Sequence, residues 1–200
     1  MSGLRARQKA DRERRILEAA SRLFREAGYD GARIDEIAAG AEVSVGTIYN
    51  YYRNKGDVLV AIVAMEVNEV VNSGRGVVAH PPANVGDAVD TLLGIYIEHS
   101  LIYLSKEMWR QAMAISTSQP DSPFGRTYSD LDRSLTDQIC ELMVRLQDRG
   151  AIRPDIDVRS AGELVFNNMN MMFIEFVKNE QATVADLRAA LRRQNRVLLK

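Results

Sequence analysis

The sequence predicts an all-helical protein, and three observations support this fold class. Apolar residues recur at intervals of three and four along almost the whole chain, as they do on one face of a helix. No sustained alternation of apolar and polar residues is found between turn residues, as a strand would require. Of the 200 residues, 46% are hydrophobic and 26% are charged, which is typical of a globular chain long enough to bury its own core.

Nine helices are predicted, each from an apolar stripe with a cap or a break at its ends. Their approximate spans are residues 10–27, 34–41, 45–52, 55–74, 87–104, 105–117, 124–149, 158–179 and 184–198. The second and third are too short to be stable alone, so they must pack on the first. The boundaries rest on stop glycines at 28, 74, 76 and 150, on the caps Asn54 and Asp157, and on a capping-box pattern of Thr183 with Asp186.

The composition excludes several classes of protein. One Cys and two His cannot supply a disulfide scaffold or the ligand spacing of a structural zinc site, so we expect no metal and no cofactor. The longest stretches without a charged residue have 11 residues, whereas a membrane-spanning helix needs about 20 apolar residues. The N-terminus lacks the apolar run of a secretory signal. We therefore expect a cytoplasmic protein without a membrane segment.

The net charge of −1 argues against bulk attraction to nucleic acid, but positive charge is concentrated at one end of the chain. Residues 1–60 carry 11 Lys and Arg against 9 Asp and Glu, and the first 15 residues alone carry six basic and two acidic side chains. The basic arm from Arg5 to Arg15 is either a solvated tail or a segment that contacts phosphate. The sequence leaves both readings open.

Residues 34–52 carry the pattern of a helix-turn-helix, which is two short helices joined by a tight turn. Ala38 is small where the two helices cross, because a larger side chain would push them apart. A helix-turn-helix pattern alone is weak evidence for DNA binding, since helical hairpins occur in many other proteins. The apolar positions expected to face inward are Ile37, Ala41, Val43 and Ile48.

The second helix of this motif has the features of a reading element. Ser44 can cap its N-terminus. Its first turn then presents Val45, Gly46 and Thr47 outward, together with backbone amides suited to phosphate. Such a helix can enter the major groove of DNA.

The residues that flank the motif make the pattern specific. Gly28-Tyr29 before it, and the stretch from Gly46-Thr47-Ile48-Tyr49 to Lys55 after it, resemble the DNA-binding domain of the TetR family of bacterial repressors, over roughly residues 10–65. The resemblance implies a nine-helix, TetR-like homodimeric repressor with a DNA-binding head, residues 1–54, and an effector-binding and dimerisation body, residues 55–200. The body itself matches only in the number and order of its helices.

Carried over position by position, the resemblance assigns roles in DNA binding. Tyr49 and Lys55 look like phosphate contacts, and Val45, Gly46, Thr47 and Asn50 look like contacts to base edges. Tyr52 is expected to pack on the first helix, and Tyr49 and Tyr51 to be exposed. The predicted DNA-binding residues are Arg33, Ser44, Val45, Gly46, Thr47, Tyr49, Asn50, Tyr51 and Lys55.

The chain departs from the family pattern at two positions. The family usually has Thr or Ser near position 33 to cap the second helix, whereas Arg33 can bind phosphate but cannot cap. The family usually has Gly in the turn at position 42, and Glu42 would cost about 1 kcal/mol there if its φ is positive. The neighbouring Gly40 is a second candidate for the bend.

The body carries aromatic and methionine side chains with a few polar groups, which suit a pocket for a mid-sized apolar or aromatic effector. Any helical core of this size also needs such residues, so a purely structural role stays open for each of them. His99 is either a hydrogen-bond donor to the effector or a satisfied core histidine. The candidates are Met65, Tyr96, His99, Tyr103, Trp109, Met113, Phe166, Asn170 and Phe173.

The segment 164–177 is apolar nearly all round and must be covered on both sides. One side can face its own domain, and the other favours a two-fold homodimer through the eighth and ninth helices. Burial under a loop of the same chain is the alternative. The predicted interface residues are Val165, Met169, Met172, Phe176, Leu187 and Leu191.

Together these observations predict a ligand-responsive, sequence-specific DNA-binding regulator. We expect a repressor that a small effector releases from a palindromic, double-stranded operator; the sequence does not distinguish it from an activator on the same fold. A helical-bundle enzyme is the rival from another class. No Glu-x-x-His pair, nucleophile elbow, Gly-rich phosphate loop or metal cluster is found, so we expect no enzymatic activity.

Overall fold

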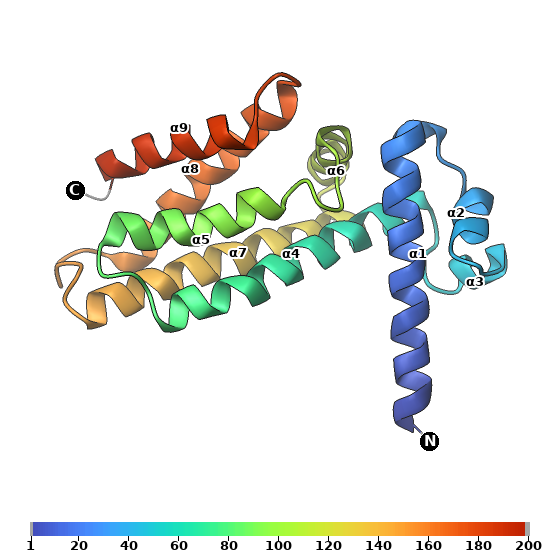
Figure 1. Ribbon diagram of the computed structural model, residues 1–200, viewed down its shortest axis with the longest axis horizontal. Coiled ribbons are helices and arrows are strands. Elements are labelled where there is room, and N and C mark those ends of the chain that lie inside the picture. The colour runs from blue at the N-terminus through green and yellow to red at the C-terminus, as the bar shows by residue number, and fades with distance from the viewer. Residues whose placement is uncertain (1, 199–200) are drawn as a thin grey trace. The chain divides into compact units, whose positions relative to one another are not determined.

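The computed structural model describes residues 2–198, and within this range it is built from nine α-helices and no strand (Figure 1). The all-helical fold predicted from the sequence is confirmed. None of the described helices is both long enough and apolar enough to cross a membrane. The helices are α1 (Ser2–Gly31), α2 (Ile34–Gly40), α3 (Val45–Tyr49), α4 (Lys55–Ala79), α5 (Val85–His99), α6 (Lys106–Ser118), α7 (Pro123–Asp148), α8 (Val158–Lys178) and α9 (Val184–Leu198).

The helices form two compact units. The first comprises the chain through Met65 together with Ile102–Tyr128, and the second comprises Glu66–Leu101 together with the chain from Ser129 onward. Helices α4 and α7 therefore contribute residues to both units. The head expected from the sequence comprises residues 1–54, and the packing groups α6 and the start of α4 with these residues.

The core of the first unit is the apolar stripe of α1. Ile16, Ala20 and Phe24 on this stripe are fully buried, and so are Ile37 of α2 and Ile48 of α3. Helix α3 has only five residues, whereas an isolated helix shorter than about 12–15 residues is marginal in water. The position of α3 therefore depends on this packing and not on helix propensity.

Helix α1 is longer than the sequence predicts, because it begins at Ser2 and not near residue 10. The residues before its buried stripe are mostly strong helix formers, and pairs such as Arg14 with Glu18, 2.7 Å apart, support the turns. Gly28 breaks the helix as predicted. Its φ of 74° and ψ of 162° lie outside the helical region, and one further turn follows.

Helix α1 is tied to α6 and to the segment before it. Glu107 of α6 accepts a hydrogen bond from the chain at the break beside Gly28, so the two helices meet at the point where α1 bends. These contacts explain why α6 belongs to the first unit. The hydrogen bonds run from Ser21 Oγ to the Tyr103 carbonyl (2.5 Å), from Arg25 Nη1 to the Ile102 carbonyl (2.5 Å), and from the Tyr29 backbone N–H to Glu107 Oε1 (3.2 Å).

In the second unit, a buried glutamine joins three helices. Gln138 of α7 accepts a hydrogen bond from the Tyr96 hydroxyl of α5 at 2.5 Å and donates from Nε2 to the Val71 carbonyl of α4 at 2.7 Å. Both side chains are buried, so these bonds satisfy polar atoms that would be costly to leave unpaired. Figure 1 shows α4, α5 and α7 running side by side, while α9 packs on α5 and α8.

The prediction that Gly74 and Gly76 end the fourth helix is wrong, because α4 continues to Ala79. Gly74 is buried, and a Cβ there would lie 2.6 Å from Gln138 Oε1 and 2.7 Å from Leu92 Cδ1. This glycine allows the helices to pack closely and does not end α4. Gly76 is exposed and has open space around it.

The predicted fifth helix is too long, because α5 ends at His99. The Ser100 hydroxyl donates to the Ile97 carbonyl at 2.8 Å, and Ser105 then caps α6 by accepting the Met108 N–H at 3.2 Å. Serine favours such local hydrogen bonds over the interior of a helix. Ser100 therefore follows the end of α5 and Ser105 precedes α6, and a short non-helical connection joins the two helices.

Three predicted N-terminal caps and one predicted C-terminal glycine are present in the structure. Gly150, with a φ of 77°, follows the end of α7 as expected. The capping hydrogen bonds run from the Asp57 N–H to Asn54 Oδ1 (2.9 Å), from the Ser160 N–H to Asp157 Oδ1 (3.3 Å), and from the Asp186 N–H to Thr183 Oγ1 (3.1 Å).

Gly74 and Gly76 offer a matched pair of substitutions in one helix. Gly74→Ala is expected to lower the free energy of unfolding by about 1–3 kcal/mol, because overpacking outweighs the roughly 1 kcal/mol that alanine gains in a helix. Gly76→Ala places a methyl group in open space and is expected to raise the free energy of unfolding by up to about 1 kcal/mol. Urea denaturation followed by circular dichroism measures both changes. Equal effects of the two substitutions would contradict the packing role of Gly74.

Candidate nucleic-acid interface

The helix-turn-helix predicted at residues 34–52 is present as α2 and α3. Of the positions expected to face inward, Ile37, Ala41 and Ile48 are buried and Val43 is half-buried. Ala38 is also buried, and its carbonyl accepts the Val43 N–H at 3.0 Å. The turn therefore closes directly on the small residue at the helix crossing, as the sequence predicts.

Ser44 holds the start of α3. Its Oγ accepts the Thr47 backbone N–H at 3.1 Å and lies 2.8 Å from Thr47 Oγ1. The predicted cap is confirmed, and it fixes the first turn of a helix that has few other local bonds.

The outward surface of α3 carries most of the residues expected to read DNA. Val45, Gly46, Tyr49 and Asn50 are exposed, and Thr47 is half-buried. Because the cap and the buried Ile48 hold α3 on the unit, these side chains occupy a fixed surface before any DNA arrives.

The three tyrosines after the turn differ in their surroundings. Tyr49 is 54% exposed, as expected, whereas Tyr51 is only half-buried, so its expected exposure holds in part. Tyr52 is buried, and its hydroxyl donates to Glu13 Oε1 of α1 at 3.4 Å. Burial and the nearby Glu13 carboxylate raise the pKa of Tyr52. Its expected packing on the first helix is confirmed.

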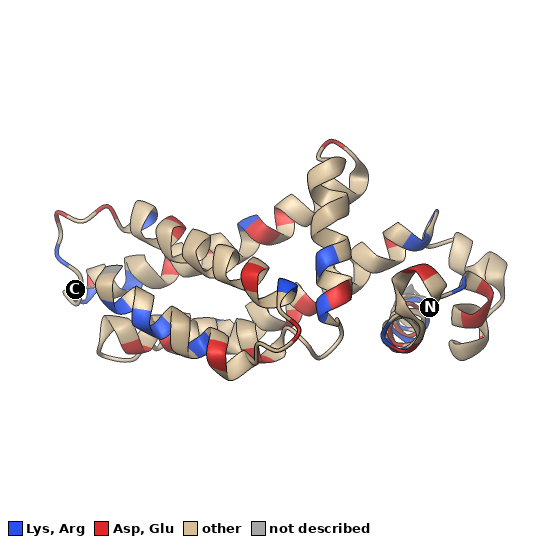
Figure 2. Cartoon of the chain, turned by 90° about the horizontal axis from the view of Figure 1, so that it is seen from above, with Lys and Arg blue, Asp and Glu red and all other residues tan. Residues whose placement is uncertain are grey.

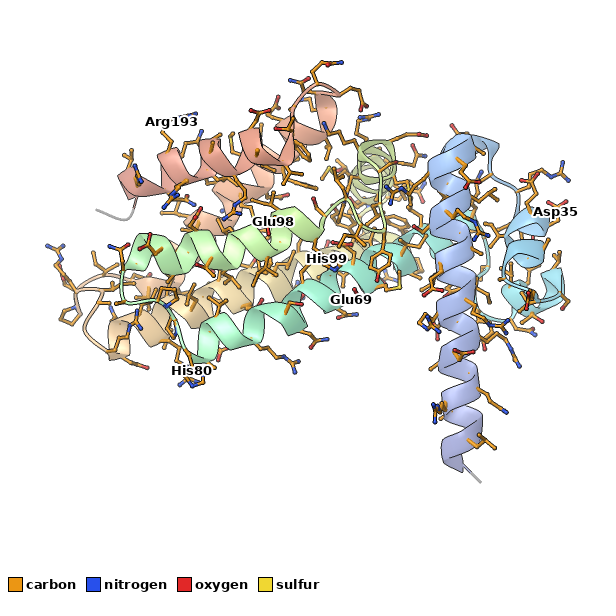
Figure 3. The ribbon with its side chains drawn as sticks, viewed as in Figure 1. Asp35, Glu69, His80, Glu98, His99 and Arg193 are labelled. Carbon is orange, nitrogen blue, oxygen red and sulfur yellow. The ribbon has the colours of Figure 1, made fainter. Side chains whose placement is uncertain are left out.

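Arg33 stands at the N-cap position of α2, where its side chain makes no capping bond. The guanidinium instead donates to both oxygens of Asp35, from Nε at 3.0 Å and from Nη2 at 3.1 Å. This hydrogen bond lowers the pKa of Asp35, which lies on the outer side of α2 (Figure 3). The Glu36 carboxylate accepts the Arg33 backbone N–H at 3.3 Å. This is one of the two hydrogen bonds of a capping box, and the other needs a side-chain acceptor that arginine lacks. To meet a phosphate, Arg33 must first exchange its carboxylate partner.

Lys55, expected to contact phosphate, is held inside the first unit. Its Nζ donates to the carbonyls of Asp30 at 3.0 Å and Ala32 at 3.2 Å, and it lies 4.7 Å from the centre of the Tyr29 ring. Since an ammonium group has three N–H donors, two of them hold the chain that follows the break in α1. In this structure Lys55 positions the start of α4 against α1.

Arg53 is a further basic residue at the motif, outside the set predicted to bind DNA. Its side chain is exposed, and its guanidinium donates to both oxygens of Asp57, at 2.8 Å and 3.2 Å. Its place between the anchoring Tyr52 and Lys55 is the signal that could have identified it.

Glu42 occupies the turn between α2 and α3 with a φ of 55°, in the left-handed region that favours glycine. Its exposed carboxylate lies 3.7 Å from Arg15 Nη1, a surface pair of little strength. The expectation that Gly40 takes up the bend is wrong, because Gly40 is the last residue of α2 and has no positive φ. A Cβ at Gly40 would lie 3.0 Å from Arg22 Nη2 and 3.4 Å from Ala19 Cβ, so this glycine allows α2 to approach α1.

The residues expected to bind an effector are divided between the two units. Trp109 in the first unit and Phe166 in the second are buried. By sequence position, Met65, Tyr103, Trp109 and Met113 belong to the first unit, and Tyr96, His99, Phe166, Asn170 and Phe173 belong to the second.

The polar effector candidates Tyr96 and His99 have protein partners. The Tyr96 hydroxyl is bonded to Gln138, as described above. His99 Nδ1 lies 2.7 Å from Glu66 Oε1 and Nε2 lies 3.3 Å from Glu69 Oε2, the pair visible beside α4 in Figure 3. Carboxylates on both ring nitrogens favour the structural role that the sequence left open for His99.

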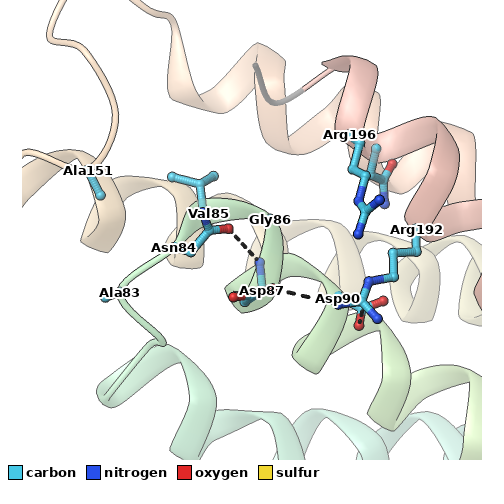
Figure 4. Close-up of a pocket in the computed structure, with 10 residues that line it drawn as sticks. Ala83, Asn84, Val85, Gly86, Asp87, Asp90, Ala151, Arg192 and Arg196 are labelled. Atoms are coloured by element: carbon cyan, nitrogen blue, oxygen red, sulfur yellow. Dashed lines mark hydrogen bonds and ion pairs between the residues drawn. The ribbon is translucent and has the colours of Figure 1, made fainter.

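A cavity of about 600 Å³ opens in the second unit beside the start of α5 (Figure 4). Asn84 caps this helix by accepting the Asp87 N–H at 3.1 Å, and Arg192 of α9 lies 3.9 Å from both Asp87 and Asp90. The lining mixes paired acidic and basic side chains. It therefore differs in character from the apolar and aromatic set expected to bind the effector.

The side chains expected at the dimer interface lie mostly within the core of their own unit. Met172 is half-buried, whereas Val165, Met169, Phe176, Leu187 and Leu191 are buried. Exposed apolar side chains on α8 and α9 are instead Leu164 (56%), Met171 (54%) and Val197 (73%). A second copy docked on these helices would contact this exposed set.

A capped helix that presents polar and aromatic side chains from a helix-turn-helix defines the class of helix-turn-helix DNA-binding regulators. The profile of the family described as bacterial regulatory proteins, tetR family, matches residues 16–62.

Relatives extend this likeness over nearly the whole chain. The fatty acid metabolism regulator protein of Bacillus subtilis (strain 168) is 23% identical over 180 residues, which is 88% of each chain. FadR from Bacillus subtilis in complex with stearoyl-CoA superposes with a TM-score of 0.70 at 20% identity, covering 93% of this chain and 97% of that one. Thermus thermophilus FadR, a TetR family transcriptional repressor in complex with lauroyl-CoA, gives 0.68 at 25% identity, covering 94% and 93%. Residues 16–62 therefore form a DNA-binding domain of the TetR type, and the chain as a whole is similar to TetR-family transcriptional regulators.

Glu42→Gly tests the strain in the turn. We expect it to raise the free energy of unfolding by about 1 kcal/mol, because glycine adopts the positive φ without a clash. We also expect tighter DNA binding, because a negative charge is removed from the motif. Glu42→Ala is the control, since it removes the charge and keeps the Cβ. It should tighten DNA binding without the gain in stability, and a full gain in urea denaturation would contradict the backbone argument.

Proposed function

We propose that this protein is a repressor that binds a palindromic operator and is released from it by a small apolar effector. The observation that carries the proposal is the surface of α3, which Ser44 caps and Ile48 anchors. In this proposal Val45, Gly46, Thr47 and Asn50 contact base edges in the major groove, and Tyr49, Tyr51, Arg33 and Lys55 contact phosphates.

A palindromic operator requires two heads related by a two-fold axis. We place the head at residues 1–54 and the body at residues 55–200, and we propose a homodimer through α8 and α9. The exposed Leu164, Met171 and Val197 support this face, since exposed large apolar side chains on two neighbouring helices favour burial against a partner. In such a dimer the two copies of α3 reach successive major grooves about 34–36 Å apart.

For the effector we propose a long-chain acyl-CoA, in which the acyl chain is the apolar part expected from the sequence and the CoA moiety is charged. Two FadR structures similar to this chain hold stearoyl-CoA and lauroyl-CoA, and a whole-length relative is a regulator of fatty acid metabolism. The aromatic and methionine residues expected at the effector site suit an acyl chain. We assume two arrangements of the body, of which one binds DNA well and the other binds DNA poorly. An effector that binds the second arrangement more tightly shifts the protein toward it, and its difference in affinity for the two arrangements limits how far DNA affinity falls. Helix α4, unbroken from Lys55 to Ala79, is the lever that we propose.

Tyr49→Ala and Asn50→Ala test the roles on α3. Tyr49→Ala is expected to weaken binding about equally on operator and unrelated DNA, because a phosphate contact carries no sequence information. Asn50→Ala is expected to cost about 1–3 kcal/mol on the operator and to relax its preference at particular bases. Gel-shift titrations on a duplex selected by the protein from a random pool, and on an unrelated duplex, separate the two. The opposite pattern would reverse the assignment.

Lauroyl-CoA and stearoyl-CoA test the effector class. Each is expected to raise the thermal stability of the protein and to release it from the selected duplex, whereas CoA without an acyl chain is expected to do neither at equal concentration. Ligand at about 100 times its Kd stabilises the folded state by about 2.7 kcal/mol, which a thermal melt resolves. If neither acyl-CoA shifts the melting temperature or DNA binding, the proposed effector class is wrong, while DNA binding by α3 stands.

A further inference from the structure

The N-terminal turns of α1 run past α2 and α3 within the first unit (Figure 1). Two contacts show which residues of α1 lie beside the end of α3. Lys9 Nζ lies 5.8 Å from the centre of the Tyr51 ring, and the Tyr52 hydroxyl donates to Glu13 Oε1 at 3.4 Å. The stretch of α1 from Lys9 to Glu13 therefore flanks the end of α3. At 1.5 Å per residue, the turns before Lys9 extend roughly 10 Å further.

One face of this stretch is turned toward the helix-turn-helix. Lys9, Arg12, Glu13 and Ile16 follow a spacing of i, i+3, i+4 and i+7, which places them on one side of α1. Ile16 is fully buried, and Glu13 contacts Tyr52. Lys9 and Arg12 continue the same face beyond the core, and both are exposed.

This face also carries the Glu13 carboxylate, which accepts the Tyr52 hydroxyl and forms no ion pair with Lys9 or Arg12. Figure 2, in which α1 is seen nearly end-on beside the N label, shows that the helix carries both acidic and basic residues. The acidic partners serve other positions, since Arg14 pairs with Asp11 at 3.1 Å and with Glu18 at 2.7 Å. Among the side chains that the structure describes, Lys9 and Arg12 take part in no ion pair.

We propose that Lys9 and Arg12 bind the DNA backbone beside the groove that α3 enters, so that the N-terminal extension of α1 is a second DNA-binding element. The inference rests on the proposed DNA binding by α3. Phosphates line both edges of the major groove, and the duplex carries one negative charge per about 1.7 Å. Two unpaired cations on a rigid helix, next to the last turn of a reading element, are placed to bind them. Such contacts set the register of the protein on DNA and carry no sequence information.

The test compares two double variants that remove the same charge from the same helix. Lys9→Gln/Arg12→Gln alters the face beside α3, and Arg7→Gln/Arg14→Gln alters the opposite face. Glutamine, arginine and lysine have similar helix propensities, so α1 is retained. The probes are a labelled 40-base-pair duplex selected by the protein from a random pool and an unrelated duplex of equal length. Binding is measured by fluorescence anisotropy over a series of KCl concentrations.

The Lys9/Arg12 variant is expected to lose about tenfold or more in affinity on both duplexes, and the slope of log K against log salt is expected to fall by about two for each bound subunit, or about four for the proposed dimer. The Arg7/Arg14 variant is expected to lose less than about threefold and to keep its slope. A third variant, Lys9→Arg/Arg12→Lys, keeps the charge and is expected to bind as the unmodified protein does.

The outcomes separate this inference from the proposed function. Equal losses in the two glutamine variants would reduce the effect to bulk charge and overturn the inference. A loss in the charge-conserving variant equal to that of Lys9→Gln/Arg12→Gln would assign the effect to packing and also overturn it. If the unmodified protein selects no duplex from the pool, DNA binding by α3 itself is refuted.

Discussion

The packing of α3 on α1 is the constraint on which the rest of this protein depends. A five-residue helix has too few hydrogen bonds to exist alone, so the reading surface exists only while Ile48 stays buried in the first unit beside the stripe of Ile16 and Phe24. The Ser44 cap and the small Ala38 at the crossing refine this arrangement but cannot replace it. A helix held from one side leaves its other side open, and that is the side that can meet DNA.

The electrostatics of the head follow from which cations already have partners. Arg33 and Arg53 each hold a carboxylate through two hydrogen bonds, and Lys55 is bonded to backbone carbonyls. These groups must exchange or share their partners before they bind phosphate. The loss of the existing hydrogen bonds reduces the free energy that each phosphate contact contributes to DNA binding. Lys9, which lies near the Tyr51 ring and forms no ion pair, has no carboxylate to exchange. The modest net charge of the N-terminal residues is thus compatible with tight DNA binding, because placement matters more than the total.

Two features of the chain bear on the proposed coupling between the body and the head. Helix α4 runs from the first unit into the second without a break. Helix α6 joins α1 through Glu107 at the point where Gly28 interrupts the helix. Both residues belong to the first unit, so this contact links α6 directly to the helix on which α2 and α3 pack.

The sequence by itself determined the helical class, most of the caps and the reading motif, because these depend on periodicity and on bonds between residues a few positions apart. It did not determine why Gly74 is a glycine, which partner Tyr96 and His99 bind, or that Leu191 faces its own unit. Only the tertiary structure decided these points. The helical spacing of a residue predicts which face of its helix it occupies. The atoms that pack against that face belong to residues far away in the chain, so the local sequence does not identify them.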